Sequence, residues 1–139
     1  MTAVLPPLFI QVALTFAIGL VMGVTRVSQS LRDPEVMSAV RAGRSDVYGR
    51  TALLMADNFR NQFEVPVLFY AAVLLAIAAG RPISDGFVTL AWVFAISRIV
   101  HAGIHCSVNI VALRFLAFLV GVIAAILMWI ELYTSLLAG

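Results

Sequence analysis

The sequence predicts an all-α integral membrane protein, built as one bundle of four membrane-spanning helices. Of its 139 residues, 63% are hydrophobic and only 12% are charged, and the mean hydropathy is +1.05. Soluble domains are about half apolar and a quarter charged. A membrane span needs about 20 residues. The chain therefore has room for four spans and their loops in a single domain, residues 1–139, and for no separate soluble domain.

The first apolar run, residues 5–25, predicts the first span. Pro6 and Pro7 lie in its opening turn, where a missing backbone N–H does no harm. The run is longer than the apolar part of a signal peptide and has no basic segment before it, so we expect it to be retained. Gly19 and Gly23 form a GxxxG pair that favours close helix contact.

A polar stretch, residues 26–50, follows the first span and is predicted to be the main loop. It holds five of the nine arginines, and Arg114 falls on the same side of the membrane, whereas the other side has Arg81 alone. Positively charged residues favour the cytoplasmic side. This distribution predicts a cytoplasmic loop with both termini outside the cytoplasm.

The remaining spans are predicted at residues 51–79, 87–107 and 113–137. The segment 80–86 has turn chemistry and is short, so the second and third spans should be antiparallel neighbours. Trp92 and Trp129 are expected to pack or to lie at the lipid interface. Glu131, within the last span, is interpreted as an interfacial carboxylate.

Two sets of polar side chains interrupt the apolar spans, where an ionisable group costs about 2.5 to 3.5 kcal/mol at mid-depth. The first set is Asp57, Arg60, Asn61 and Glu64, and the second is Arg98, His101 and His105. Helical spacing puts each set on one face. We expect both stripes to point inward and to meet near the cytoplasmic side, where Arg60, one turn before Glu64, can pair with it.

Several interpretations of these stripes are compatible with the residues. Mutual pairing would specify helix or subunit assembly. His101 and His105 have the spacing of helical zinc ligands, but the arginines would repel a cation, so no metal is expected. A proton-coupled transporter is a further alternative.

Arginines, histidines and an amide together favour an anionic ligand or an ionised thiol. Nucleic acid is not expected, because the arginines are scattered and lysine is absent.

Three motifs in order resemble the family of membrane-associated proteins in eicosanoid and glutathione metabolism (MAPEG), which includes microsomal glutathione transferases. They are Asn61-x-x-Glu64 followed by Pro66, then Arg98-x-x-His101-x-x-x-His105, then Arg114. Length, four spans and a long loop after the first span agree as well. The resemblance is to bacterial members, which implies the bacterial inner membrane.

The resemblance implies a homotrimer in lipid that binds glutathione as co-substrate between subunits, near the cytoplasmic face. It implies glutathione-binding roles for Arg60, Asn61, Glu64, Arg98, His101 and His105, and a catalytic role for Arg114. Glu64 would hold the amino group of glutathione, and Arg114 would lower the thiol pKa from about 8.5.

The implied function is a glutathione-dependent transferase or peroxidase acting on hydrophobic electrophiles. The chain departs from the family pattern in having Asp57 one turn before the motif asparagine, where members carry a basic residue, and His105 in place of a tyrosine. These departures motivate the alternative, a non-catalytic protein of the same fold whose buried charges serve assembly or bind another anion.

Overall fold

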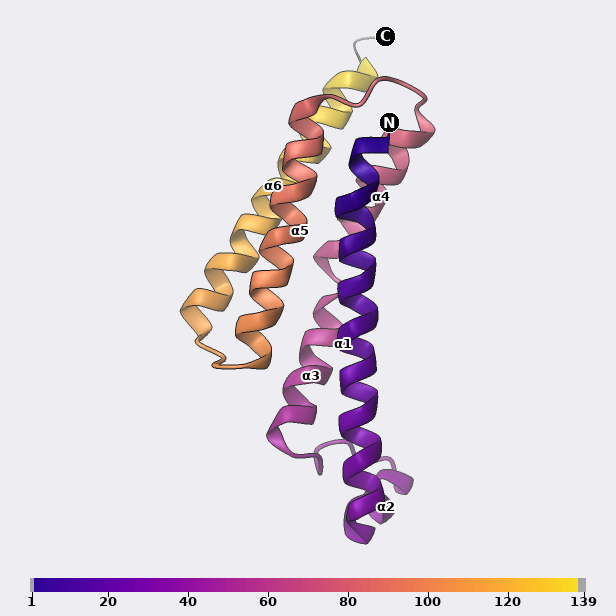
Figure 1. Ribbon diagram of the computed structural model, residues 1–139, viewed down its shortest axis with the longest axis vertical. Coiled ribbons are helices and arrows are strands. Elements are labelled where there is room, and N and C mark those ends of the chain that lie inside the picture. The colour runs from indigo at the N-terminus through magenta and orange to yellow at the C-terminus, as the bar shows by residue number, and fades with distance from the viewer. Residues whose placement is uncertain (1, 138–139) are drawn as a thin grey trace.

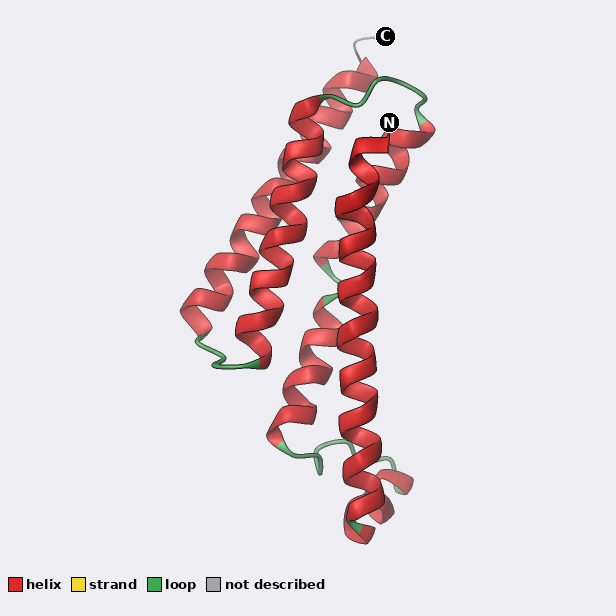
Figure 2. Ribbon diagram, viewed as in Figure 1, coloured by secondary structure: helices red, strands yellow, loops and turns green. Residues whose placement is uncertain are grey.

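The computed structural model describes residues 2–137, and the secondary structure within them is entirely helical (Figures 1 and 2). The elements in chain order are η1 (Thr2–Val4), α1 (Leu5–Arg32), α2 (Pro34–Arg41), α3 (Arg50–Asn61), α4 (Val65–Ala78), α5 (Asp85–Cys106) and α6 (Val111–Leu137). Four helical stretches are long and apolar enough to span a membrane: η1 with α1, α3 with α4, α5, and α6. The predicted all-α class with four spans is confirmed.

The predicted loop at residues 26–50 is partly helical, because α1 continues to Arg32 and α2 follows after one residue. Asp33 separates them. Its Oδ1 accepts hydrogen bonds from the backbone N of Glu35 at 2.9 Å and of Val36 at 3.4 Å, and Pro34 occupies the first turn of α2. An aspartate cap followed by proline starts a new helix. The first and second spans are therefore joined by a capped helix and a shorter loop.

The residues just before α3 contact the C-terminal turns of α1. The Arg26 guanidinium lies 5.0 Å from the centre of the Tyr48 ring, and the Tyr48 hydroxyl is 3.3 Å from Ser30 Oγ. Gln29 Oε1 accepts a hydrogen bond from Gly49 N at 2.8 Å. These contacts fix where α3 begins relative to α1.

The spans pack around α5, which contacts α1, α3 and α6. Figure 1 shows α5 and α6 as an antiparallel pair, with α1 lying alongside α3 and α4. α2 lies at one end of the molecule, which we call the arginine-rich end because residues 26–50 are there. The start of α1, the end of α6 and the α4–α5 connection lie at the opposite end, called the α4–α5 end.

An apolar core fills the half of the bundle toward the α4–α5 end. Phe69 of α4 and Phe94 of α5 stack with ring centres 4.3 Å apart. Small side chains let the helices approach, and Ala72, Ala91 and Ala124 are all buried. Further along α5 the inward positions become polar. Ser97, Arg98, His101 and His105 are buried there.

Candidate functional site

Arg98 is the most unusual side chain in the buried polar part of the bundle. It is 1% exposed, and its Nη2 donates a hydrogen bond to the Asn61 carbonyl oxygen at 3.2 Å. Its Nε and Nη1 are buried with no hydrogen-bond partner, and no carboxylate among residues 2–137 forms an ion pair with it. The guanidinium carbon lies 6.0 Å from the centre of the Phe118 ring. A buried guanidinium with two unpaired nitrogen atoms has the donors that an anion could accept from.

His101 and His105 lie on the same buried face of α5, with ring centres 5.7 Å apart and the rings edge to face. His101 Nδ1 is 3.0 Å from the Arg114 carbonyl oxygen, which fixes the ring against α6. His101 Nε2 and His105 Nδ1 have no hydrogen-bond partner among the described residues. Together with Arg98, the inward stripe of α5 offers four buried nitrogen atoms that have no hydrogen-bond partner within residues 2–137.

Arg114 begins the second turn of α6, close to the α5–α6 turn. Its Nη1 donates to Asn109 Oδ1 at 2.6 Å, and Asn109 has a backbone φ of 49°. Asparagine tolerates this left-handed conformation better than most residues. The Arg114 side chain is half-buried. Its backbone contacts His101 while its guanidinium is held at the turn.

The second span is broken in its middle, between Asn61 and Val65 (Figure 2). Pro66 has no N–H to donate to the carbonyl of residue 62 and restricts the residue before it, so a continuous helix cannot run through this point. The break leaves the Asn61 carbonyl without its helical donor. Arg98 supplies one instead.

The first polar stripe does not point inward as predicted. Asp57, Arg60 and Glu64 are exposed on the surface of the protomer, and Asn61 is half-buried. Arg60 Nη1 pairs with Asp57 Oδ1 at 3.5 Å, rather than with Glu64. The inward positions of this segment belong to Asn58 and Gln62. The predicted face was therefore turned by about one residue, or about 100° around the helix.

Asn58 and Gln62 belong to a buried amide ladder that sequence reasoning missed; we define this ladder as Gln11, Gln62 and Asn58. Gln11 Nε2 donates to Gln62 Oε1 at 2.9 Å, and Gln62 Nε2 donates to Asn58 Oδ1 at 3.0 Å. Asn58 Nδ2 lies 2.8 Å from Cys106 Sγ. The available signal was a pair of amides at i and i+4 in the second span, with a lone amide in the first.

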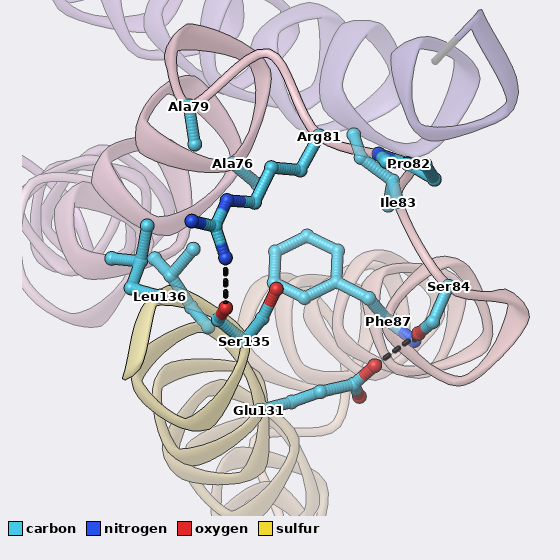
Figure 3. Close-up of a pocket in the computed structure, with 11 residues that line it drawn as sticks. Ala76, Ala79, Arg81, Pro82, Ile83, Ser84, Phe87, Glu131, Ser135 and Leu136 are labelled. Carbon is cyan, nitrogen blue, oxygen red and sulfur yellow. Dashed lines mark hydrogen bonds between the residues drawn. The ribbon is translucent and has the colours of Figure 1, made fainter. Parts of the chain in front are cut away.

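A second polar cluster lies at the α4–α5 end, around a small pocket (Figure 3). The Ser84 hydroxyl donates to the Glu131 carboxylate and accepts from Phe87 N at 2.9 Å, so Ser84 caps α5. Arg81 donates to the Ser135 carbonyl oxygen of α6. These contacts lock the connection before α5 onto the last turns of α6. The two charged groups of this pocket are thereby occupied within the protein.

No set of three histidine, cysteine or acidic side chains within residues 2–137 is arranged as a metal site. The buried donors around Arg98 are cationic or neutral nitrogen groups, which suit an anion. The candidate site consists of the α5 stripe, the break between α3 and α4, and the start of α6.

A comparison with known protein families decides the classification. The model of the MAPEG family matches residues 4–134, which is nearly the whole chain. The chain belongs to the MAPEG family. No curated protein and no solved structure matches it.

MAPEG membership confirms the family that the three motifs indicated, and it makes the chain an integral membrane protein of the family that serves glutathione and eicosanoid metabolism. All three motifs fall within the matched region. In the folded chain, Arg98 of α5 contacts the Asn61 carbonyl oxygen, and His101 of α5 contacts the Arg114 carbonyl oxygen of α6. The first part of Asn61-x-x-Glu64 thus faces α5, while Glu64 opens to the surface of the protomer.

Proposed function

We propose that this MAPEG protein is a glutathione-dependent membrane transferase or peroxidase that acts on hydrophobic electrophiles. The observation that carries the proposal is Arg98, a buried guanidinium with two unsatisfied nitrogen groups and no carboxylate partner among residues 2–137. An uncompensated buried charge is strongly unfavourable. An anionic ligand that completes its hydrogen bonds removes that cost.

Glutathione fits the donor set. At neutral pH it carries two carboxylates, one ammonium group and a thiol. Arg98 and Arg114 complement carboxylates or a thiolate, and Glu64 complements the ammonium group. Glu64 has an exposed side chain and forms no ion pair within the described residues. The half-buried Asn61 accepts a hydrogen bond from Arg98 at its backbone carbonyl oxygen, and we propose that its side-chain amide binds the peptide. Arg60 contacts Asp57 through Nη1 alone, so its other guanidinium N–H groups could bind a carboxylate.

The residues of the chain would bind and orient the peptide and stabilise its thiolate. Bound glutathione supplies a sulfur nucleophile, which either displaces a leaving group from an electrophilic carbon or reduces a hydroperoxide with a second glutathione as co-reductant. Arg114 would favour the thiolate electrostatically. His101 and His105 would supply hydrogen bonds from their unsatisfied nitrogens. The apolar surroundings suit an electrophile that arrives from the bilayer.

The binding site would be completed by a neighbouring subunit in a homotrimer. Asp57, Arg60 and Glu64 are exposed on the isolated protomer although they lie within a membrane span. Charged groups in spans face protein or water-filled cavities rather than lipid. A second protomer packed against this surface would bury glutathione between them.

We further propose that the arginine-rich end faces the cytoplasm of a bacterial cell, with both termini outside, because most of the arginines lie there. In a Cys106→Ala background, Ser45→Cys should react with a membrane-impermeant maleimide only after spheroplasts are permeabilised. Pro82→Cys should react in intact spheroplasts. The opposite pattern would reverse the proposed orientation.

Calorimetric titration of the detergent-solubilised protein with glutathione tests the central proposal. We expect saturable binding, and at 100 times Kd the ligand should add about 2.7 kcal/mol to stability. Glu64→Gln should weaken binding at least tenfold, whereas Glu35→Gln, an exposed carboxylate on α2, should leave it unchanged. Absence of wild-type binding would reject the function.

The role of Arg114 has its own spectroscopic test. Adding glutathione to the wild-type protein should produce the ultraviolet absorbance of a thiolate at neutral pH, and Arg114→Ala should abolish it without lowering thermal stability comparably. Arg44→Ala, on the exposed loop, is the matched control. Unchanged thiolate absorbance in Arg114→Ala would remove Arg114 from the chemistry.

One observation favours the second candidate function, a non-catalytic protein of this fold. The Asp57–Arg60 pair at 3.5 Å occupies exposed positions that a neighbouring subunit could cover for assembly alone. If the exposed charges of the second span serve assembly alone, Glu64→Gln should dissociate the oligomer. A Glu64→Gln variant that stays assembled but no longer binds glutathione would favour the enzyme instead.

A further inference from the structure

The amide ladder is placed where it can control the broken span. Gln11, Gln62 and Asn58 are each 0% exposed. Gln11 lies in α1, Asn58 lies in α3, and Gln62 directly follows α3. Asn58 also reaches α5, where its Nδ2 lies 3.4 Å from the Ala102 carbonyl oxygen. The hydrogen bonds therefore run without interruption from α1 through α3 to α5.

Burying three primary amides in an apolar bundle is unfavourable unless their hydrogen bonds are made. Apolar side chains of similar volume would pack α1 against α3 without that requirement. Packing alone therefore does not explain the three amides, and we look for their role in the hydrogen bonds that they make. Directional hydrogen bonds fix one conformation, whereas apolar contacts permit many.

Gln62 repairs the backbone at the break. In a regular helix the backbone N of Gln62 would donate to the Asn58 carbonyl oxygen, four residues earlier. Here it donates to the Phe59 carbonyl oxygen at 3.1 Å, in a tighter turn. The Gln62 side chain supplies the missing donor, with its Nε2 3.3 Å from the Asn58 carbonyl oxygen. The side chain of Gln62 thus stabilises the tight last turn of α3.

Gln62 lies between two residues of the proposed glutathione site. The residue before it, Asn61, presents its carbonyl oxygen to Arg98 at 3.2 Å. Two residues after it, Glu64 has backbone angles of φ −99° and ψ −107°, which are not helical, and its side chain is exposed. The direction in which Asn61 and Glu64 point depends on the conformation of this tight turn.

We propose that Gln62, held by Gln11 and Asn58, is a positioning residue for glutathione binding. It keeps the break in one conformation, so that Asn61 and Glu64 are already oriented when glutathione arrives. A site held in place before binding loses less entropy on binding. This inference rests on the proposed function, and the ladder residues, each 0% exposed, would act through Asn61 and Glu64 rather than by contact with glutathione.

The test compares glutathione binding and turnover in Gln62→Met and Gln11→Met with the wild type. Methionine preserves side-chain length and removes the hydrogen bonds. Gln62→Met should weaken glutathione binding at least tenfold and Gln11→Met about threefold. KM for glutathione should rise while kcat at saturating glutathione stays nearly constant. Gln11→Met keeps the Gln62–Asn58 contacts, so it decides the question if Gln62→Met fails to fold.

Two controls separate positioning from loss of stability. Gln29→Met removes the hydrogen bond of another glutamine of α1, at Gly49, and should leave Kd unchanged. Val73→Ala makes a cavity in the apolar core and should lower thermal stability without changing Kd.

Coupling to Glu64 gives a readout that a purely structural role would not affect. The weakening caused by Glu64→Gln should be at least threefold smaller in the Gln62→Met background, because Glu64 is then no longer held in place. Equal weakening in both backgrounds, or wild-type Kd in a folded Gln62→Met protein, overturns the proposal while leaving the proposed function intact. Absence of glutathione binding by the wild type overturns both.

Discussion

At the residue scale, the chain keeps one arginine in an environment that penalises it. Arg98 is enclosed by α5, α6 and the break in the second span, and its one hydrogen bond goes to a backbone carbonyl. Such a group contributes little to folding, because two of its nitrogen atoms lost water and gained no partner. The proposed function accounts for Arg98 as a ligand-binding residue rather than as a stabilising one.

Replacing Arg98 should therefore separate binding from stability. We expect Arg98→Met to raise the free energy of unfolding without ligand, or to leave it within about 1 kcal/mol, because apolar replacements of poorly compensated buried charges are often neutral or stabilising. Glutathione binding should weaken at least tenfold, which is about 1.4 kcal/mol. Thermal unfolding and calorimetric titration measure the two effects.

Arg81→Met provides the matched control, since Arg81 lies at the other end and bonds to Ser135. It should lose some stability and keep the wild-type Kd for glutathione. An Arg98→Met protein that unfolds far more easily yet binds glutathione normally would show that Arg98 is a structural residue.

The polar residues differ in how far sequence could place them. Arg98, His101 and His105 repeat at helical spacing in one uninterrupted helix, so their shared face was predictable. In the second span, charged residues and amides alternate around the helix, and two neighbouring faces were both polar. The choice between them depends on which face meets α1 and α5, and only the folded chain determines that. The amides Asn58 and Gln62 turned inward, and Asp57 and Glu64 did not.

At the scale of elements, close approach of α5 and α6 depends on a glycine. A Cβ atom on Gly121 would lie 2.7 Å from Ser97 Oγ. The Ser97 hydroxyl is buried and donates to the Phe94 carbonyl oxygen at 2.7 Å, so it has little freedom to move away. Ser97, which makes this contact, directly precedes Arg98 in α5. The packing of these two helices therefore supports the position of the guanidinium.

Gly121→Ala should lower the free energy of unfolding by about 1–3 kcal/mol through overpacking. Adding Ser97→Ala removes the obstructing oxygen and should recover most of that loss, which gives a coupling that a double-mutant cycle can measure. Gly103→Ala is the control on α5, because its Cβ would meet no atom within 4 Å. Simple addition of the Gly121 and Ser97 effects would contradict this account of the interface.

The start of α5 offers a second test at this scale. Ser84→Ala should cost about 1 kcal/mol, because Phe87 N loses its cap and Glu131 loses a donor. Aspartate caps helices as well as serine does. Even so, Ser84→Asp should be worse than Ser84→Ala here, because two carboxylates would then face each other.

Adding Glu131→Gln to Ser84→Asp should restore thermal stability, since the amide can donate to the new carboxylate. If Ser84→Asp is as stable as the wild type, the contact between Ser84 and Glu131 does not hold α5 against α6. Glu131 was expected from sequence to be an interfacial carboxylate. Its contact with the α5 cap could not be foreseen, because it joins residues 47 positions apart.

At the scale of the whole molecule, hydropathy predicted the class and the number of spans, and the short segment 80–86 predicted that the second and third spans are antiparallel. The division of the bundle into an apolar half and a polar half was less visible, because it depends on how the helices align lengthwise. Proline provided a partial signal for the break, since Pro66 cannot continue a helix. Subunit interfaces are the hardest feature to predict from the sequence, because apolar residues face lipid and protein alike.

The exposed charges on the second span lead to the last prediction. The Arg60 and Asp57 side chains are 75% and 58% exposed on the protomer although they lie in an apolar span. Left in lipid, each would cost about 2.5 to 3.5 kcal/mol at mid-depth. Neighbouring subunits of the proposed trimer would cover these side chains.

We therefore expect native mass spectrometry of the detergent-solubilised protein to give three times the 15.0 kDa mass of the chain. A Ser45→Arg substitution, which places a further charge on the exposed loop outside the spans, should leave this mass unchanged. A monomer in mild detergent that still binds glutathione would show that one protomer forms the complete site and that these charges meet lipid headgroups or water instead.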